Sequence, residues 1–193
     1  MTRKRVAILI SGRGSNMAAL IEAAKAADFP AEIALVVSNV PDAAGLARAR
    51  EAGMTTAVLD HKPFGKDRAA FESALQRILD EHRVELVCLA GFMRLFTAEF
   101  VQRWSGRMLN IHPSLLPEFP GLDPHGQALR AGAKTSGATV HFVIPETDAG
   151  PIIAKESVPV LANDTPETLA ARVLEAEHRI YPQALSQVAQ GKT

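Results

Sequence analysis

The chain has one cysteine, Cys88, among its 193 residues. A single cysteine excludes a disulfide within the chain and any metal site that needs paired cysteines. Cys88 lies in the apolar run of residues 87–90, a setting typical of a small core residue rather than a reactive thiol. The chain also lacks an excess of either charge, because its 21 basic and 21 acidic side chains cancel. This balance argues against a broad nucleic-acid-binding surface, although not against a local basic pocket.

Long apolar runs are missing as well. No stretch approaches the roughly 20 residues that a membrane-spanning helix needs. The basic start at residues 1–5 is followed by an apolar run of only residues 6–10, which is too short for a secretory signal peptide. We therefore expect a cytoplasmic protein without a membrane partner. The length suits a single domain over residues 1–193.

Short apolar runs alternate along the chain with stretches of helical period. The runs predict strands at residues 6–10, 33–37, 55–59, 84–90 and 108–111. Apolar residues spaced three and four apart predict helices around residues 17–24, 42–50 and 71–79. Asp42 is the expected cap of the second helix. This order predicts an α/β fold with a mostly parallel central sheet and helices on both faces.

The C-terminal part has a different pattern. Two β-rich runs, residues 138–144 and 152–160, are separated by a short turn-rich stretch and are expected to pair antiparallel. Thr165 and Pro166 are typical of a helix start. In the helix that follows, Pro182 predicts a bend or an end. The loop of residues 113–126 shows no element of its own, and a loop of that length is more often functional than idle.

A glycine-rich segment, residues 11–16, joins the first strand to the first helix. Glycines let the backbone approach an anion, and the helix start presents free N–H groups and the positive end of the dipole. A dinucleotide fingerprint would need a third glycine where Met17 stands and an acid near Ser38 and Asn39. The pattern therefore disfavours a nicotinamide cofactor and favours a terminal phosphate. The alternative is a tight turn with an ordinary helix cap.

Asn110 and His112 lie two residues apart on a predicted strand, so their side chains face the same way. An amide beside an imidazole is suited to stabilising an oxyanion and moving a proton. If Asp148 in the turn of residues 145–151 reaches His112, its charge favours the imidazolium. A histidine in a strand is by itself more often structural. The polar pair at a strand end, before a long Pro- and Gly-rich loop, favours catalysis.

Two other chemistries fit the residues less well. Ser114 follows His112 by two residues, but there is no G-x-S-x-G elbow for a serine hydrolase. His112, His125 and His141 could in principle gather a metal ion, yet no H-E-x-x-H or comparable spacing is present. We therefore expect no metal.

An ordered set of motifs resembles the formyltransferase superfamily that uses 10-formyltetrahydrofolate, and within it the branch that acts on glycinamide ribonucleotide (GAR) in purine synthesis. The resemblance extends over about residues 6–180. The motifs are ISGRGSN at residues 10–16, LAGFMR at 89–94, LNIHPSLLP at 109–117, FPG at 119–121, VHF at 140–142 and DAGP at 148–151.

The resemblance implies a role for each matching position. Asn110, His112 and Asp148 are the implied catalytic residues. Glu177 is expected to contact the amine end of the substrate, although an exposed helix charge is an equal reading without the resemblance. The phosphate of GAR would lie on Gly14, Ser15 and Asn16. The 10-formyltetrahydrofolate co-substrate would place its acidic tail near the cation of Arg68. The rest of the molecule would contact the pocket residues Met93, Arg94, Leu95 and Phe96, and also Asn110.

The implied reaction is direct acyl transfer from the formylfolate to the substrate amine. Two positions depart from the pattern, Glu118 and Gly126, and both lie in the loop near the substrate. The alternatives are a formyltetrahydrofolate deformylase, a methionyl-tRNA formyltransferase and a non-catalytic sensor of a phosphorylated ligand. The phosphate loop disfavours the first, the neutral charge the second and the complete catalytic trio the third. We expect no nucleic-acid partner and either a monomer or a homodimer.

Overall fold

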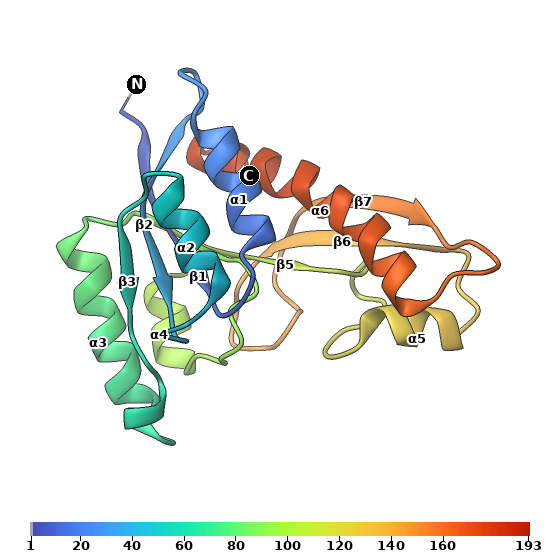
Figure 1. Ribbon diagram of the computed structural model, residues 1–193, viewed down its shortest axis with the longest axis horizontal. Coiled ribbons are helices and arrows are strands. Elements are labelled where there is room, and N and C mark those ends of the chain that lie inside the picture. The colour runs from blue at the N-terminus through green and yellow to red at the C-terminus, as the bar shows by residue number, and fades with distance from the viewer. Residues whose placement is uncertain (1) are drawn as a thin grey trace.

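The computed structural model describes residues 2–193, which form a seven-stranded mixed sheet flanked by helices (Figure 1). The strands are ordered β3-β2-β1-β4-β5-β6-β7 across the sheet. Strands β1 to β5 run parallel, whereas β6 and β7 are antiparallel to their neighbours. The predicted fold class is therefore confirmed. The strands are β1 Lys4–Ile10, β2 Ala31–Ser38, β3 Thr56–Val58, β4 Leu86–Leu89, β5 Met108–His112, β6 Thr135–Phe142 and β7 Ile152–Pro159.

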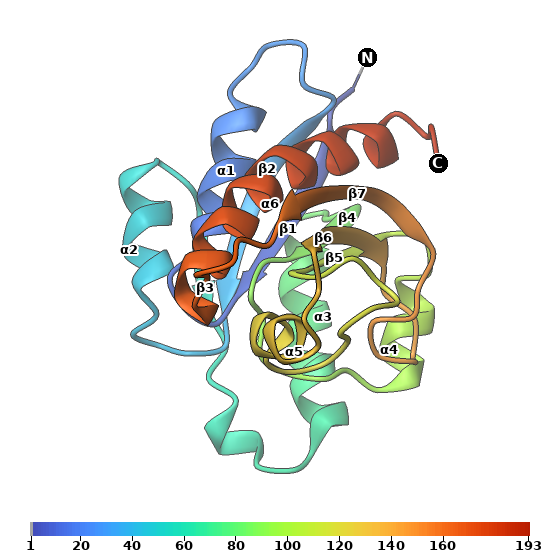
Figure 2. The same ribbon diagram turned by 90° about the vertical axis from the view of Figure 1, so that its right-hand side faces the viewer.

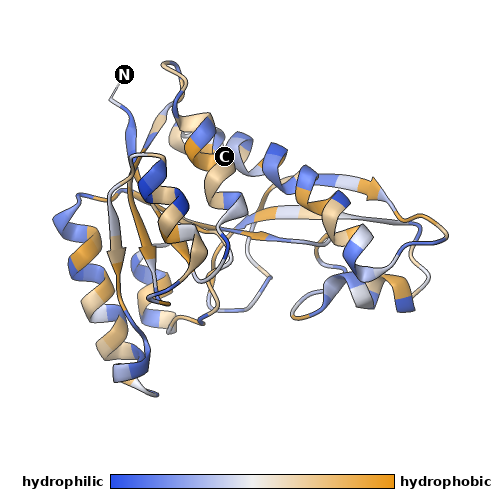
Figure 3. Cartoon of the chain, viewed as in Figure 1, coloured by the Kyte–Doolittle hydropathy of each residue, from blue (hydrophilic) through white to orange (hydrophobic). Residues whose placement is uncertain are grey.

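The helices cover both faces of the sheet, as Figures 1 and 2 show from two directions. They are α1 Ser15–Ala24, α2 Ala44–Glu51, α3 Arg68–Glu81, α4 Ala98–Arg103, α5 Pro124–Arg130 and α6 Pro166–Ala189, with a 3₁₀ turn η1 at Lys62–Phe64. Alternate residues of β1 explain the two layers: Val6 and Ile8 pack in the cluster of α1, α2 and α6, whereas Ala7 and Leu9 pack in the cluster of α3 and α4. Apolar colouring accordingly follows the central strands and the inner helix faces in Figure 3.

Helix α6 packs across one face of the sheet. It packs on β6 and β7 and also on α1, and it starts from a Thr165 capping box. Pro182 lies inside the helix, which continues to Ala189, so of the two predicted outcomes the end of the helix is wrong and the bend stays a prediction. The missing N–H frees one carbonyl of the preceding turn, but packing of Tyr181, Ala184 and Leu185 in the core holds the helix together.

Two further local expectations are corrected, and one helix was not expected. Ala43, not Asp42, precedes α2, and no side chain caps that helix. The loop of residues 113–126 contains the start of α5, where Asp123 accepts a hydrogen bond from the Gly126 N–H. Helix α4 was not predicted. Both α4 and α5 are too short to show a helical period in the sequence.

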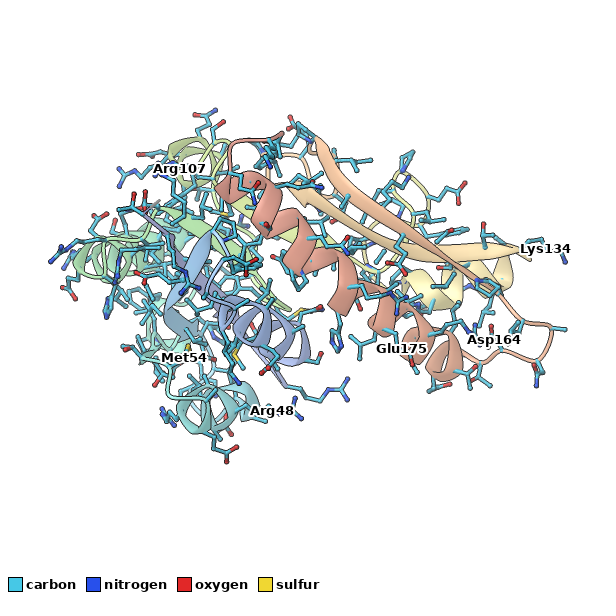
Figure 4. All side chains as sticks on the ribbon, turned by 90° about the horizontal axis from the view of Figure 1, so that it is seen from above. Arg48, Met54, Arg107, Lys134, Asp164 and Glu175 are labelled. Carbon is cyan, nitrogen blue, oxygen red and sulfur yellow. The ribbon has the colours of Figure 1, made fainter. Side chains whose placement is uncertain are left out.

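The topology brings several loops to one edge of the sheet. The chain proceeds from β1 outward to β2 and β3, then returns to place β4 on the other side of β1. The carboxyl ends of β1 and β4 therefore diverge to opposite faces, which is where open α/β sheets bind ligands. At the other end of the molecule, an ion pair joins the loop after β7 to α6: Arg172 Nη1 lies 2.7 Å from Asp164 Oδ2. Figure 4 shows Asp164 and Lys134 at this end and Arg107 at the opposite end. Among residues 2–193, no helix has the length and apolar character that crossing a bilayer requires.

Candidate active site

The glycine-rich segment forms a small cavity at the switch point. Gly14 has a φ of 70° as the N-cap residue of α1, and no side chain caps the helix. A Cβ on Gly14 would come within 2.9 Å of Met17 Cε and 3.1 Å of Gly45 Cα, so both backbone conformation and packing require glycine. The cavity, about 130 Å³, is lined by Gly12, Arg13, Gly14, Ser15, Asn16, Ala90 and Gly91. The first N–H groups of α1 have no helical partner, so this arrangement favours an anion.

Asn16 connects this cavity to α6. Its Nδ2 lies 3.4 Å from Glu177 Oε1, and its own Oδ1 is buried without a partner among the described residues. Glu177 is 7% exposed. Burial raises the pKa of Glu177 to about 7, partly opposed by the hydrogen bond from Asn16. The reading of Glu177 as an exposed helix charge, which the sequence left open, is therefore wrong, because Glu177 is buried against Asn16, a residue that lines the cavity.

The three predicted catalytic residues come together at the end of β5. His112 is 6% exposed, and its Nδ1 lies 3.5 Å from Asp148 Oδ2. His112 Nε2 lies 2.9 Å from the Phe119 carbonyl oxygen. A carbonyl only accepts, so Nε2 carries a proton and Nδ1 is the nitrogen that faces Asp148. The Gly121 N–H donates to Asp148 Oδ2 at 2.9 Å, so the loop after β5 orients the carboxylate.

His141 is a further member of this cluster whose role the sequence did not indicate. In the β5–β6 pair, His141 stands opposite Asn110, and its Nε2 lies 3.4 Å from Asn110 Nδ2. Its Nδ1 lies 2.9 Å from the Phe142 carbonyl oxygen, which places the proton on Nδ1 and leaves Nε2 as an acceptor. Burial lowers the pKa of His141, which favours this neutral form. Only the pairing register of the hairpin could have revealed the contact.

Gly150 explains how the turn with Asp148 reaches the strands. A Cβ at this position would come 1.7 Å from the Phe142 carbonyl oxygen and 3.4 Å from His141 Nδ1. Only glycine lets the turn pack so closely on β6. His141 Nε2 consequently lies 3.9 Å from Asp148 Oδ1. The hairpin thus places one neutral imidazole beside both Asn110 and Asp148.

A larger cavity of about 270 Å³ opens beside this cluster. Asn110, His141 and Asp148 lie in its lining, and Arg68 at the first position of α3 contributes a cation. Phe92 and Phe96 stack with ring centroids 5.4 Å apart. The predicted pocket residues Arg68, Arg94, Leu95 and Phe96 all line the cavity. Met93 is not among the lining residues and is 72% exposed. The arginines and stacked aromatic rings of the cavity suit a partly aromatic molecule with an acidic group.

Comparison with known proteins decides the family. A family model described as formyl transferase matches residues 4–185.

The chain belongs to the formyl transferase family.

Several relatives of this formyl transferase are similar over nearly its whole length. The trifunctional purine biosynthetic protein adenosine-3 of Gallus gallus is 54% identical over 97% of the chain, which spans only 18% of that protein. The phosphoribosylglycinamide formyltransferase of Escherichia coli K12 is 45% identical, with 97% of this chain and 88% of the relative covered. The crystal structure of phosphoribosylglycinamide formyltransferase from Brucella melitensis is 54% identical with a TM-score of 0.94, covering 100% and 98% of the two chains.

Glu118 and Gly126, the two positions expected to depart from the motif pattern, have different structural surroundings. A Cβ at Gly126 would lie 2.3 Å from Asp123 Oδ2, so a larger residue there would displace the carboxylate that caps α5. Glu118 is exposed, and its backbone carbonyl accepts a hydrogen bond from Ser114 Oγ at 2.5 Å. The Glu118 side chain is therefore free to vary without disturbing this turn. Among residues 2–193, no group of three or more His, Cys, Asp or Glu is placed to hold a metal ion.

Proposed function

We propose that the protein transfers the formyl group of 10-formyltetrahydrofolate to the amine of GAR, which gives formyl-GAR and tetrahydrofolate in de novo purine biosynthesis. The observation that carries the proposal is that Asn110 and Asp148 line one cavity, with Asp148 beside His112, while a second cavity of different character follows the neighbouring strands β1 and β4. One cavity is built for an anion, and the other offers stacked aromatic rings and arginines. A phosphorylated amine and a folate are the two partners that formyl transfer to GAR requires.

The proposed substrate contacts follow from the two cavities. Gly14, Ser15 and Asn16 bind the phosphate of GAR, and Glu177 contacts its amine end. Arg68 pairs with the acidic tail of the folate. Arg94, Leu95 and Phe96 surround its aromatic part, whereas Met93 contributes through its backbone. Asn110 contacts the formyl group.

In the proposed mechanism the GAR amine attacks the formyl carbon and forms a tetrahedral oxyanion. Asn110 stabilises this oxyanion with the second hydrogen of its amide, because the first points to His141. His112 as imidazolium stabilises the same charge and then gives a proton to the departing folate nitrogen. Asp148 supports the charged imidazole and accepts the proton that the amine loses, through water. One proton thus moves from the amine to the folate nitrogen overall.

A deformylase would use the same three residues with water as the acceptor. The anion cavity beside Glu177 favours the transferase, because a hydrolase needs no phosphate-binding loop. A cytoplasmic location, the absence of nucleic-acid partners and a monomeric or homodimeric state stay predictions from the sequence.

The test is the loss of the formyl group from 10-formyltetrahydrofolate, followed by absorbance with and without GAR. We expect loss only when GAR is present. Loss without GAR would replace the proposal with the deformylase, and no loss with folded protein would contradict both.

A further inference from the structure

We propose that the Ser11 hydroxyl couples the two substrate sites, so that GAR and the folate bind cooperatively. The inference rests on the proposed function for the identity of the two ligands. Ser11 is a positioning residue: it belongs to neither cavity lining, but its side chain joins the two loops that form them.

The two loops leave adjacent strands in opposite directions. Residues 11–14 lead from β1 to α1 on one face of the sheet, and residues 90–97 lead from β4 to α4 on the other face. Regular pairing of the two strands ends where the Ala90 N–H donates to the Leu9 carbonyl at 2.9 Å. Past this point the loops diverge, and a side chain has to hold them together.

Ser11 provides that connection. The Met93 N–H donates to Ser11 Oγ at 2.8 Å. Among residues 2–193, this is the one hydrogen bond that the backbone of residues 91–96 makes, as donor or acceptor. Residues 91–96, several of which line the larger cavity, are therefore joined to the first residue of the glycine-rich segment, residues 11–16. Stacking of Phe92 on Phe96 supports the same loop.

The Ser11 hydroxyl is itself held in one orientation. It donates its single hydrogen to Asn39 Oδ1, so its lone pairs are left for the Met93 N–H. Asn39 is 2% exposed, and its backbone carbonyl accepts a hydrogen bond from His61 Nδ1 at 2.9 Å. The acceptor is thus fixed by residues that follow β1, β2 and β3. A change in the backbone at Ser11 on anion binding is transmitted to Met93 rather than absorbed by rotation of the hydroxyl.

The consequence is a reciprocal effect on binding. A ligand that orders residues 11–16 also orders residues 91–96, so the second ligand loses less conformational freedom on binding. We expect saturating GAR to tighten the binding of tetrahydrofolate about 2- to 10-fold, the effect of a neutral hydrogen bond. Saturating tetrahydrofolate should tighten the binding of GAR by the same factor.

Calorimetric titration with tetrahydrofolate, with and without GAR, tests the coupling, because this pair cannot react. The Ser11→Ala variant should bind both ligands with no coupling, and Ser11→Thr, which keeps the hydroxyl, should restore it. Ser105→Ala, at an exposed serine outside both loops, is the matched control and should keep the wild-type factor. Gly91 adjoins both loops, so coupling that persists in Ser11→Ala would travel through Gly91 and overturn the proposal.

A second measurement needs no variant. Amide hydrogen exchange in the segment of residues 92–96 should slow when GAR binds to the wild-type protein, and unchanged exchange would contradict the coupling. Formyl transfer without any coupling would overturn this inference alone. If GAR fails to bind at all, the proposed function is wrong and the inference falls with it.

Discussion

The first half of the sheet, β1 to β4, and the second half, β5 to β7, build their parts of the site from different groups. The cavity after β1 is lined by backbone and small residues, and Gly12 and Arg13 are exposed. The cluster after β5 consists of side chains, and His112 and His141 are 6% and 3% exposed. The first part offers fixed N–H groups, which suit binding a charge that does not change. The second part offers buried titratable side chains, which suit proton transfer.

The largest effect should come from the proton-moving part. Asp148→Asn keeps the shape of the side chain but removes the charge beside His112. We expect kcat to fall about 100- to 10,000-fold, the usual contribution of a general acid or base, with little change in the dissociation constant of tetrahydrofolate. Steady-state kinetics and calorimetry measure the two quantities. Asp28→Asn, at an exposed aspartate, is the control, and undiminished turnover in Asp148→Asn would remove this residue from the mechanism.

Glu177 tests the contact between the two parts, because it lies in α6 and its carboxylate contacts Asn16 at the start of α1. Its pKa rises from 4.5 to about 7 on burial. From pH 4.5 to 7 the unfolded chain has lost this proton while the folded chain retains it. The free energy of unfolding therefore falls as pH rises through this window.

Over this pH window the free energy of unfolding should fall by an amount on the order of 3 kcal/mol in total. Glu177→Gln should abolish this slope and be more stable than the wild type above pH 7, as measured by urea unfolding at pH 5 and pH 8. Glu175→Gln is the control, because Glu175 is exposed on the same helix (Figure 4). Identical slopes in wild type and Glu177→Gln would mean that burial does not shift this carboxyl.

His141 separates orientation from chemistry within the second part. His141→Ala removes the acceptor that holds the Asn110 amide. Small misplacements of catalytic groups are costly, so we expect kcat to fall about 10- to 50-fold while the Michaelis constant of the folate changes little. His141→Gln, with an acceptor at the end of its side chain, should recover part of the loss. If the two variants behave alike, the histidine does not act through the amide. His82→Ala, at the end of α3, is the control.

The smallest effect should come from the place where the two halves of the sheet meet, between β4 and β5. Tyr181 is fully buried, and its hydroxyl lies 2.8 Å from the Leu89 carbonyl of β4 and 3.2 Å from the Leu109 carbonyl of β5. Tyr181→Phe leaves both carbonyls without this donor. We expect the free energy of unfolding to fall by about 1 to 2 kcal/mol, with formyl transfer retained, in urea denaturation and activity assays. A variant of unchanged stability would show that water replaces the hydroxyl.

The contrast also explains what the sequence could predict. The anion-binding loop is local: its glycines are contiguous, and their meaning depends only on the strand before and the helix after. The strands and the position of Asn110 and His112 at a strand end follow from apolar patterning. The contact of His141 with Asn110 depends on strand pairing across 31 residues, which periodicity does not encode. Helices α4 and α5 are too short to have a period, and Pro182 is tolerated because packing outweighs one lost hydrogen bond.

The two ends of the described chain lie near each other, on the side of the sheet where β1 begins. Thr2 and Arg3 border the same surface hollow as Gln190 and Lys192, and Figures 1 and 2 agree on this placement. Both cavities described above lie instead at the carboxyl ends of the strands. A tag, a linker or a neighbouring domain attached at either end would leave the substrate entrances open. The same geometry suits a unit that forms part of a longer polypeptide, as in the Gallus gallus protein, of which the matching segment makes up 18%.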